Sequence, residues 1–147
     1  MYYTLVNGSI ADYWAKWQPS GVPSGGSIYE VFVYVPSDHA TTWQARYTIV
    51  HTFGTTTAVV DQNGLYNQWV SIGTYHMEPE HYVYTTDATG EGYRNHCYNA
   101  IGSALGQNYC QVGVDAVKFV RRGTTYLPDI KADGDWTSSV IVRSNGG

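Results

Sequence analysis

The stretch YEVFVYVPSDHATTWQARYTIVH, residues 29–51, decides the fold class of this chain. Its first half alternates apolar with polar or aromatic residues, and side chains at alternate positions of a β-strand share one face. A second alternating run follows the interruption PSDH at 36–39. We therefore predict two core strands joined by a loop that carries Trp43. The face predicted to be buried in the first strand consists of Tyr29, Val31, Val33 and Val35.

The same alternation recurs along most of the chain, separated by turns rich in Gly, Pro, Asn and Ser. No segment of about ten or more residues has a convincing helical period of apolar side chains. Short strands at regular spacing without helices are typical of a β-sandwich or jelly roll. About seven strands are predicted, at residues 9–18, 28–35, 44–52, 55–62, 68–77, 81–87 and 111–122. Residues 44–52 and 55–62, which meet at Phe53 and Gly54, are expected to form a hairpin.

Composition supports one β-rich domain and excludes two classes of partner. The chain has 147 residues, enough for one ordinary core, and only 14% of them are charged. The formal charge of −4 provides no basic surface, so no nucleic-acid binding is expected. No run approaches the roughly 18 apolar residues that span a bilayer, so no membrane insertion is expected either.

Three further stretches resemble one known family. They are ARYTIVHTFGTTTAVVDQNG (45–64), QWVSIGTY (68–75) and VGVDAVKFVRR (112–122). In this order they resemble the golvesin C-terminal, or xanthan-lyase carbohydrate-binding-like, domain of secreted bacterial proteins. The preceding segments ADYWAKWQP (11–19) and YEVFVYVPSDHAT (29–41) resemble the entry strands of the same family, so the resemblance covers about residues 9–122. It implies a galactose-binding-like jelly roll that serves as a noncatalytic, carbohydrate-binding accessory module of a larger secreted or cell-surface protein, although fold alone does not determine function.

The domain is expected to occupy residues 1–122, because the composition changes beyond that point. Residues 123–147 are predicted to form a linker followed by an isolated strand-like run, WTSSVIVRS at 136–144, as at the start of another module. A lone strand cannot bury its apolar face by itself. It is therefore expected to dock back on the domain, to pair with another copy or to be mobile. Self-association through residues 136–144 favours a second function class, a structural or adhesive β module that spaces or assembles an extracellular protein.

The connection 89–111 is longer than such a sandwich needs, and it contains both cysteines of the chain. Loops beyond about 12–15 residues are usually functional or disordered. Its glycines allow Cys97 and Cys110 to approach each other, so we predict a disulfide, which would fit an oxidising compartment. Two interpretations stay open for the connection, a loop that contributes specificity and an inert insertion closed by the disulfide.

Catalytic and metal sites receive little support from the sequence. There are five histidines, but no G-x-S-x-G elbow and no cysteine-protease signature, so an enzyme is not expected and no cofactor is predicted. The run HMEPEH at 76–81 is compatible with zinc, and also with a polar turn. Asp87, Glu91 and Asp115 are compatible with a structural calcium ion, which prefers hard oxygen ligands. The alternative for Asp115 is a buried carboxylate that accepts backbone amides.

Loop aromatics are the predicted ligand contacts, since a sugar ring stacks its C–H face on an aromatic side chain. Trp14 or Trp17, together with Trp69, occupy alternating strand positions and are expected in the core. The aromatic residues assigned to loops, and so predicted to contact polysaccharide, are Trp43, Tyr66, Tyr93 and Tyr98.

Overall fold

A computed structural model describes residues 1–91, 97 and 110–123 of this chain, and within these residues the fold is all-β. No helix long and apolar enough to cross a membrane occurs in these parts of the chain. The strands are β1 (Tyr2–Leu5), β2 (Trp14–Trp17), β3 (Ser27–Val35), β4 (Ala45–His51), β5 (Gly54–Val60), β6 (Gln68–Met77), β7 (Tyr82–Thr86), β8 (Gln111–Val114) and β9 (Val117–Gly123).

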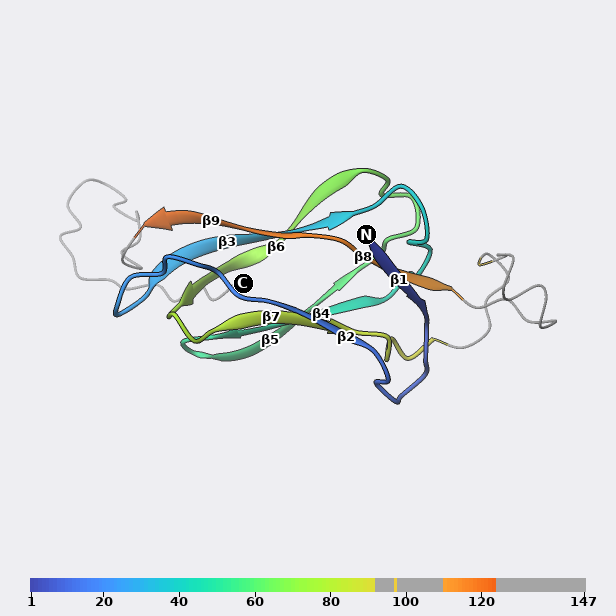
Figure 1. Ribbon diagram of the computed structural model, residues 1–147, viewed down its shortest axis with the longest axis horizontal. Helices are drawn as coiled ribbons and strands as arrows, with labels where there is room; N and C mark the ends of the chain where they lie inside the picture. Colours follow the sequence, from blue (N-terminus) through green and yellow to red (C-terminus); the bar gives the residue numbers. More distant parts are fainter. Residues whose placement is uncertain (92–96, 98–109, 124–147) are drawn as a thin grey trace, which may run out of the picture.

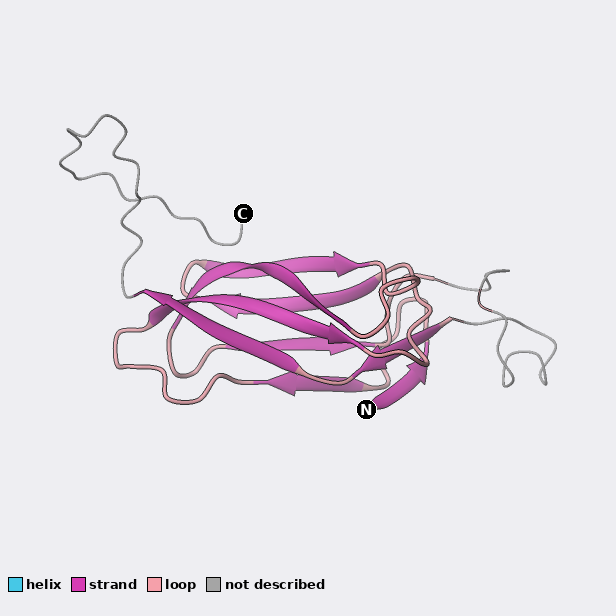
Figure 2. Cartoon of the chain, turned by 90° about the horizontal axis from the view of Figure 1, so that it is seen from above, coloured by secondary structure: helices cyan, strands magenta, loops and turns pink. Residues whose placement is uncertain are grey.

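The two larger sheets form the layers of a sandwich. One has the strand order β2-β7-β4-β5 and the other β6-β3-β9, and all of these strand pairs are antiparallel. Figure 1 shows the two layers edge on, and Figure 2 shows their strands running along the length of the molecule. The remaining pair, β1-β8, forms a small separate sheet, and β1 lies between the two layers in Figure 1. The β-sandwich is thereby confirmed, and the galactose-binding-like jelly roll stays a prediction.

The core forms where the alternating faces of β3 and β4 meet. The face predicted from sequence is buried, because Val31, Val33 and Val35 are fully inaccessible and Tyr29 is 6% exposed. Across the sandwich, Ala45, Tyr47 and Ile49 of β4 supply the opposing buried face in a run of alternate positions. Fully burying a side chain such as valine contributes roughly 1.5–3 kcal/mol. β3 is also the central strand of its sheet, paired with both β6 and β9.

The hairpin predicted between residues 44–52 and 55–62 is confirmed. β4 and β5 pair without a shift from Ala45 opposite Val60 to His51 opposite Gly54. Thr52 and Phe53 form the turn, and Gly54 follows with a φ of +129°, a conformation that side-chain-bearing residues rarely adopt. The prediction of residues 68–77 as one strand is also correct, since β6 covers this range.

The predicted closing strand, residues 111–122, is wrong as a single element. It breaks at Asp115 and Ala116 into β8 and β9, which belong to different sheets. The reason is a partner that the sequence did not reveal, because β1 pairs with β8 from Tyr2 opposite Val114 to Leu5 opposite Gln111. Ala116 then accepts a hydrogen bond from the Tyr34 backbone N–H, and this bond brings the chain onto β3.

The expectation that Trp14 or Trp17 lies in the core is met by Trp17, whereas Trp69, also expected there, lies on the surface. Trp14 is 72% exposed and Trp69 is 42% exposed, whereas Trp17 is partly buried and packs against the core. Trp69 lies on the outer face of its sheet, where its ring meets Tyr34 edge-on and the Lys118 ammonium group lies 4.5 Å from its centre. Alternation identifies the residues that share a face, but the packing of the sheets decides which face is covered.

Candidate ligand-binding site

Trp43 lies on the β3–β4 loop, residues 36–44, and its side chain is exposed, with 41% of the residue accessible. The backbone of this loop is fixed against the start of β8. The N–H groups of Thr41 and Thr42 both donate to the Gln111 carbonyl oxygen, at 2.9 and 3.1 Å. In return, the Gln111 N–H donates to the Thr41 hydroxyl oxygen at 2.9 Å. The indole is therefore carried by a loop in a defined conformation.

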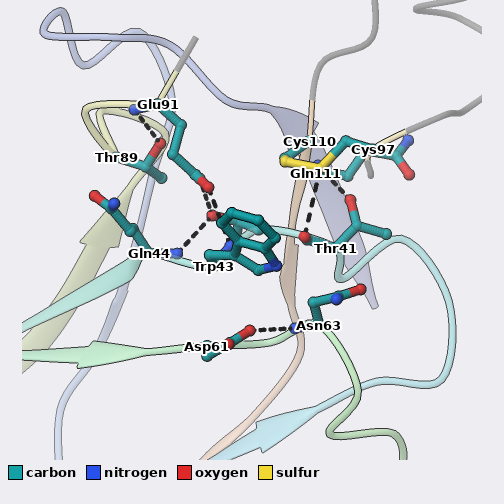
Figure 3. Close-up of a disulfide and its surroundings, with 11 residues drawn as sticks. Thr41, Trp43, Gln44, Asp61, Asn63, Thr89, Glu91, Cys97, Cys110 and Gln111 are labelled. Carbon is teal, nitrogen blue, oxygen red and sulfur yellow. Dashed lines mark hydrogen bonds between the residues drawn. A yellow bond between two sulfur atoms is a disulfide. The ribbon is translucent and has the colours of Figure 1, made fainter. Parts of the chain in front are cut away.

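Glu91 holds the same loop from the opposite side. Its carboxylate is fully buried and accepts a hydrogen bond from the Trp43 backbone N–H at 3.1 Å and another from the Thr42 hydroxyl group. The Thr42 hydroxyl oxygen in turn accepts from the Gln44 N–H at 3.0 Å, and the Glu91 N–H donates to Thr89 Oγ1 at 3.2 Å. Figure 3 shows this chain of bonds beneath Trp43. Within the described residues, this buried carboxylate is thus bonded by one side-chain hydroxyl group and one backbone N–H.

A disulfide joins Cys97 and Cys110 beside the loop, as predicted, and both cysteines are buried. Cys110 directly precedes Gln111, and Cys97 Sγ lies 3.6 Å from the Thr41 carbonyl oxygen (Figure 3). The cross-link therefore anchors the end of the 89–111 connection to the segment that fixes Trp43. A buried structural disulfide fits an oxidising, extracellular environment.

Polar side chains of the β5–β6 loop, residues 61–67, lie next to the Trp43 loop. The Gln62 N–H donates to the Thr42 carbonyl oxygen at 2.9 Å, which places Asp61 and Asn63 beside Thr42 and Trp43. Asp61 and Asn63 are exposed, and an Asp61 carboxylate oxygen accepts the Asn63 N–H at 3.0 Å. Figure 3 draws Trp43 between Glu91 and this pair. An exposed indole is thus flanked by groups that can bond hydroxyls.

Gln62 itself was not singled out from the sequence, although it lies in one of the stretches that carry the family resemblance. Its buried side-chain amide bonds to both the carbonyl oxygen and the N–H of Gly113, at 2.9 and 3.0 Å, as a neighbouring strand would. It also donates to the Tyr47 hydroxyl oxygen at 3.2 Å. Burial of Tyr47 raises the pKa of its hydroxyl group to about 12. The hydrogen bond from Gln62 lowers this pKa, but desolvation has the larger effect.

The other predicted ligand residues have different outcomes. Tyr66 is 52% exposed on the β5–β6 loop, and the neighbouring Asn67 side chain accepts a bond from the Tyr34 hydroxyl group at 3.0 Å. Tyr93 and Tyr98 lie outside the described residues, so their role stays a prediction.

The three carboxylates considered for calcium have separate partners. Asp87 is buried and accepts the N–H groups of Asp12 and Tyr13, at 3.0 and 3.1 Å. Glu91 bonds the Trp43 loop, while Asp115 is exposed on the β8–β9 turn, 3.8 Å from the Met1 amino nitrogen. The proposed burial of Asp115 is therefore wrong, and Asp87 has that role instead. Calcium binding stays a prediction, and these contacts do not bring the three groups to one point.

The HMEPEH turn does bring metal-type side chains together. Within the described residues, Glu78, Glu80 and His81 form a group of three with donor atoms within 4.8 Å of one another. However, His81 Nδ1 accepts the Glu78 N–H at 2.8 Å, and His76 Nδ1 bonds the Thr52 hydroxyl group at 2.7 Å. These bonds are those of an ordinary polar turn, and zinc binding here stays a prediction.

Together, these features define a class of protein, an all-β sandwich module that presents an exposed loop tryptophan. The Golvesin C-terminal domain family matches residues 1–121. The chain belongs to this family, which confirms the resemblance of its motifs, and it is accordingly an accessory-type domain of larger proteins. Comparisons with curated proteins and with solved structures find no match.

Proposed function

We propose that this chain is a noncatalytic carbohydrate-binding module of a secreted or cell-surface protein, with Trp43 as its principal contact to polysaccharide. The observation that supports the proposal is an exposed indole on a loop held by Glu91, Gln111 and a disulfide. Holding a contact side chain in place before binding reduces the conformational entropy lost on association. The disulfide also supports an extracellular location.

The chemistry around Trp43 suits a sugar ring. The apolar C–H face of a pyranose stacks on an indole, while hydroxyl groups need nearby donors and acceptors. Asp61 and Asn63 provide an exposed carboxylate and an exposed amide beside the Trp43 loop. Tyr66, exposed on the same β5–β6 loop, is a further aromatic contact. Tyr93 and Tyr98 remain in the proposal as predicted contacts of the 89–111 connection.

Binding by one domain is expected to be weak. Stacking of one ring contributes on the order of 1 kcal/mol beyond its burial, so two or three contacts correspond to micromolar to millimolar dissociation constants. Tight attachment to a polymer would then come from several modules in one parent protein, through a high effective concentration.

The test combines a glycan array with calorimetric titration of the oligosaccharides that bind. We expect Trp43→Ala to raise the dissociation constant about fivefold or more. Trp69→Ala is the matched control, because Trp69 and Trp43 are 42% and 41% exposed but lie on different elements. The proposed function fails if the wild-type chain binds no glycan at millimolar concentration. If glycan binds but Trp43→Ala binds as tightly as wild type, Trp43 is not the principal contact.

The edge strand β5 favours a second candidate function, a structural or adhesive module. β5 pairs with β4 alone among the described strands, and its sequence GTTTAVV has no charged residue. Val59 is 58% exposed on it. Long uncharged edges readily accept another strand. If this function applies, the wild-type chain should self-associate in sedimentation velocity experiments, and Val59→Lys should abolish that association.

A further inference from the structure

A second group of exposed aromatic side chains, none of them predicted from the sequence to contact ligand, surrounds a groove between β1 and β2. The groove has a volume of about 400 Å³. Tyr2, Tyr13 and Trp14 line it and are 80%, 65% and 72% exposed. Its floor contains Thr85 and Val112, which are almost fully buried. Large apolar rings are therefore gathered around a hollow that reaches the core.

The groove is shaped by the strand pairing. β1 pairs with β8 while β2 pairs with β7, so the two strands diverge from a common end (Figure 1). Buried Asp87 fixes that end. Its carboxylate accepts the N–H groups of Asp12 and Tyr13, its carbonyl oxygen accepts the Asn7 N–H at 2.7 Å, and its own N–H donates to the Tyr13 carbonyl oxygen at 3.3 Å.

A second hollow of about 490 Å³ continues past this end and shares Tyr3, Tyr13 and Asp87 with the groove. It adds two polar side chains, Asn7 and Asp12, whose amide nitrogen and carboxylate oxygen are 2.9 Å apart on the surface. Each keeps hydrogen-bonding capacity beyond this bond, because an amide has two N–H donors and a carboxylate accepts several bonds. The aromatic side chains of the groove are thus followed by the polar side chains of the second hollow.

The charge of this surface restricts its ligand. The described residues that line the two hollows include no Lys, Arg or His, and they include the carboxylates of Asp12 and Asp87. An anionic polysaccharide would meet like charge without a compensating cation, whereas an uncharged chain would not.

We infer that the groove between β1 and β2 binds an uncharged polysaccharide chain, with sugar rings on Tyr13 and Trp14 and hydroxyl groups on Asn7 and Asp12. The inference rests on the proposed carbohydrate-binding function and adds a second contact surface with a defined ligand charge. Trp43 and the groove both adjoin β8, because Thr41 and Thr42 bond Gln111 and β1 pairs with residues 111–114.

The test uses the full chain in native affinity electrophoresis with hydroxyethyl cellulose, galactomannan and polygalacturonate as probes. We expect retardation by an uncharged probe and not by polygalacturonate. Trp14→Ala should raise the dissociation constant about fivefold, and Tyr13→Ala by a similar factor, while Trp69→Ala should bind as wild type does. Trp14→Phe, which keeps an aromatic face, should retain most of the affinity. Thermal unfolding of each variant checks that its fold is intact.

The results separate this inference from the proposed function. Binding that Trp43→Ala weakens and Trp14→Ala leaves unchanged would overturn the groove and keep the function. Binding of polygalacturonate alone among the probes would likewise overturn the groove as a site for an uncharged chain and keep the proposed function. Binding weakened by Trp14→Ala supports the groove, whatever Trp43→Ala does. If the wild-type chain binds none of the probes and Trp14→Ala instead abolishes self-association in sedimentation velocity, the groove is a protein interface and the inference is wrong.

Discussion

At the scale of single residues, two buried carboxylates organise the loops at one end of the sandwich. Asp87 accepts the backbone N–H groups of Asp12 and Tyr13, and Glu91 accepts that of Trp43. Each accepts hydrogen bonds that offset part of its desolvation. The groups that donate to these carboxylates are buried or partly buried. Removing either carboxylate should therefore lower the free energy of unfolding by a measurable amount.

Replacing Glu91 with alanine tests this role. The Thr42 hydroxyl group and the Trp43 N–H would lose their acceptor inside the protein, so we expect the free energy of unfolding to fall by about 2–3 kcal/mol. Glu30→Ala is the control, because Glu30 forms a surface ion pair with Arg122 that is worth less than about 1 kcal/mol. Urea denaturation of both variants gives the comparison. Equal losses would contradict the role assigned to Glu91.

His51 gives the domain a predictable response to pH. Burial, and secondarily the positive charge of nearby His81, lowers the pKa of His51 below its ordinary value of 6.5. Its ring is held neutral in the β4–β5 turn, since Nδ1 accepts the Phe53 N–H at 3.3 Å and Nε2 bonds Thr56 Oγ1 at 2.9 Å. The unfolded chain therefore takes up this proton at a higher pH than the folded one.

It follows that the stability contributed by neutral His51 is fully present above pH 6.5 and decreases as the pH falls below that value. We expect the wild-type chain to be less stable at about pH 5 than at about pH 7.5, and His51→Gln to show a smaller difference between the two. Urea denaturation at both pH values measures this. The explanation is wrong if the substitution leaves the pH dependence unchanged.

At the scale of elements, β8 is packed against the β3–β4 loop more tightly than its four residues suggest. An added Cβ at Gly113 would lie 2.8 Å from Ala40 Cβ and 2.8 Å from Pro36 Cγ. We expect Gly113→Ala to destabilise the domain by about 1–3 kcal/mol through overpacking. Gly8→Ala is the control, because nothing lies within 4 Å of its added Cβ and a change under about 0.5 kcal/mol is expected. Stability losses of equal size for the two variants, measured from their denaturation midpoints, would refute the tight packing of β8.

The disulfide stabilises the same region by closing the loop between two cysteines that are 13 residues apart in sequence. Reduction should lower the free energy of unfolding by roughly 2–3 kcal/mol, because the unfolded chain gains conformational freedom. Thermal unfolding with and without reductant measures the loss, and the double variant Cys97→Ser/Cys110→Ser should not respond to reductant. Intact-mass measurement of the unreduced, denatured protein should detect no alkylated thiol, and two alkylated thiols would contradict the bond.

At the scale of the whole molecule, the described part of the chain forms both sheets of the sandwich from strands within residues 14–123. β9 ends at Gly123, paired with the central strand β3, and the Gly123 carbonyl oxygen accepts the Ser27 hydroxyl group. We therefore expect a chain of residues 1–123 to unfold cooperatively, as followed by circular dichroism. Failure to fold would show that the WTSSVIVRS segment belongs to the sheet. A folded product that has lost self-association would support the assembly function.

The sequence by itself determined the β class, the β4–β5 hairpin, the extent of β6 and the buried face of β3. Each of these follows from local alternation or turn chemistry, which neighbouring residues encode directly. The loop position of Trp43 was also predictable, since it follows a proline-interrupted break between two core strands, whereas the sequence left open whether its side chain is exposed or folded onto the core. The family motifs and the pair of cysteines added the disulfide, whose two residues lie in one connection.

Only the tertiary structure decided how distant segments meet. The pairing of Tyr2 with Val114, the split of residues 111–122 and the anchoring of Trp43 by Glu91 each join residues far apart in sequence. Likewise, Trp14 or Trp17 was expected in the core, and the fold decides that Trp17 packs there. Trp14 lies on the rim of a groove, because β2 is an edge strand whose outer face nothing in the described chain covers. Local periodicity assigns residues to faces, whereas burial depends on which elements pack against those faces, and that is a property of the whole fold.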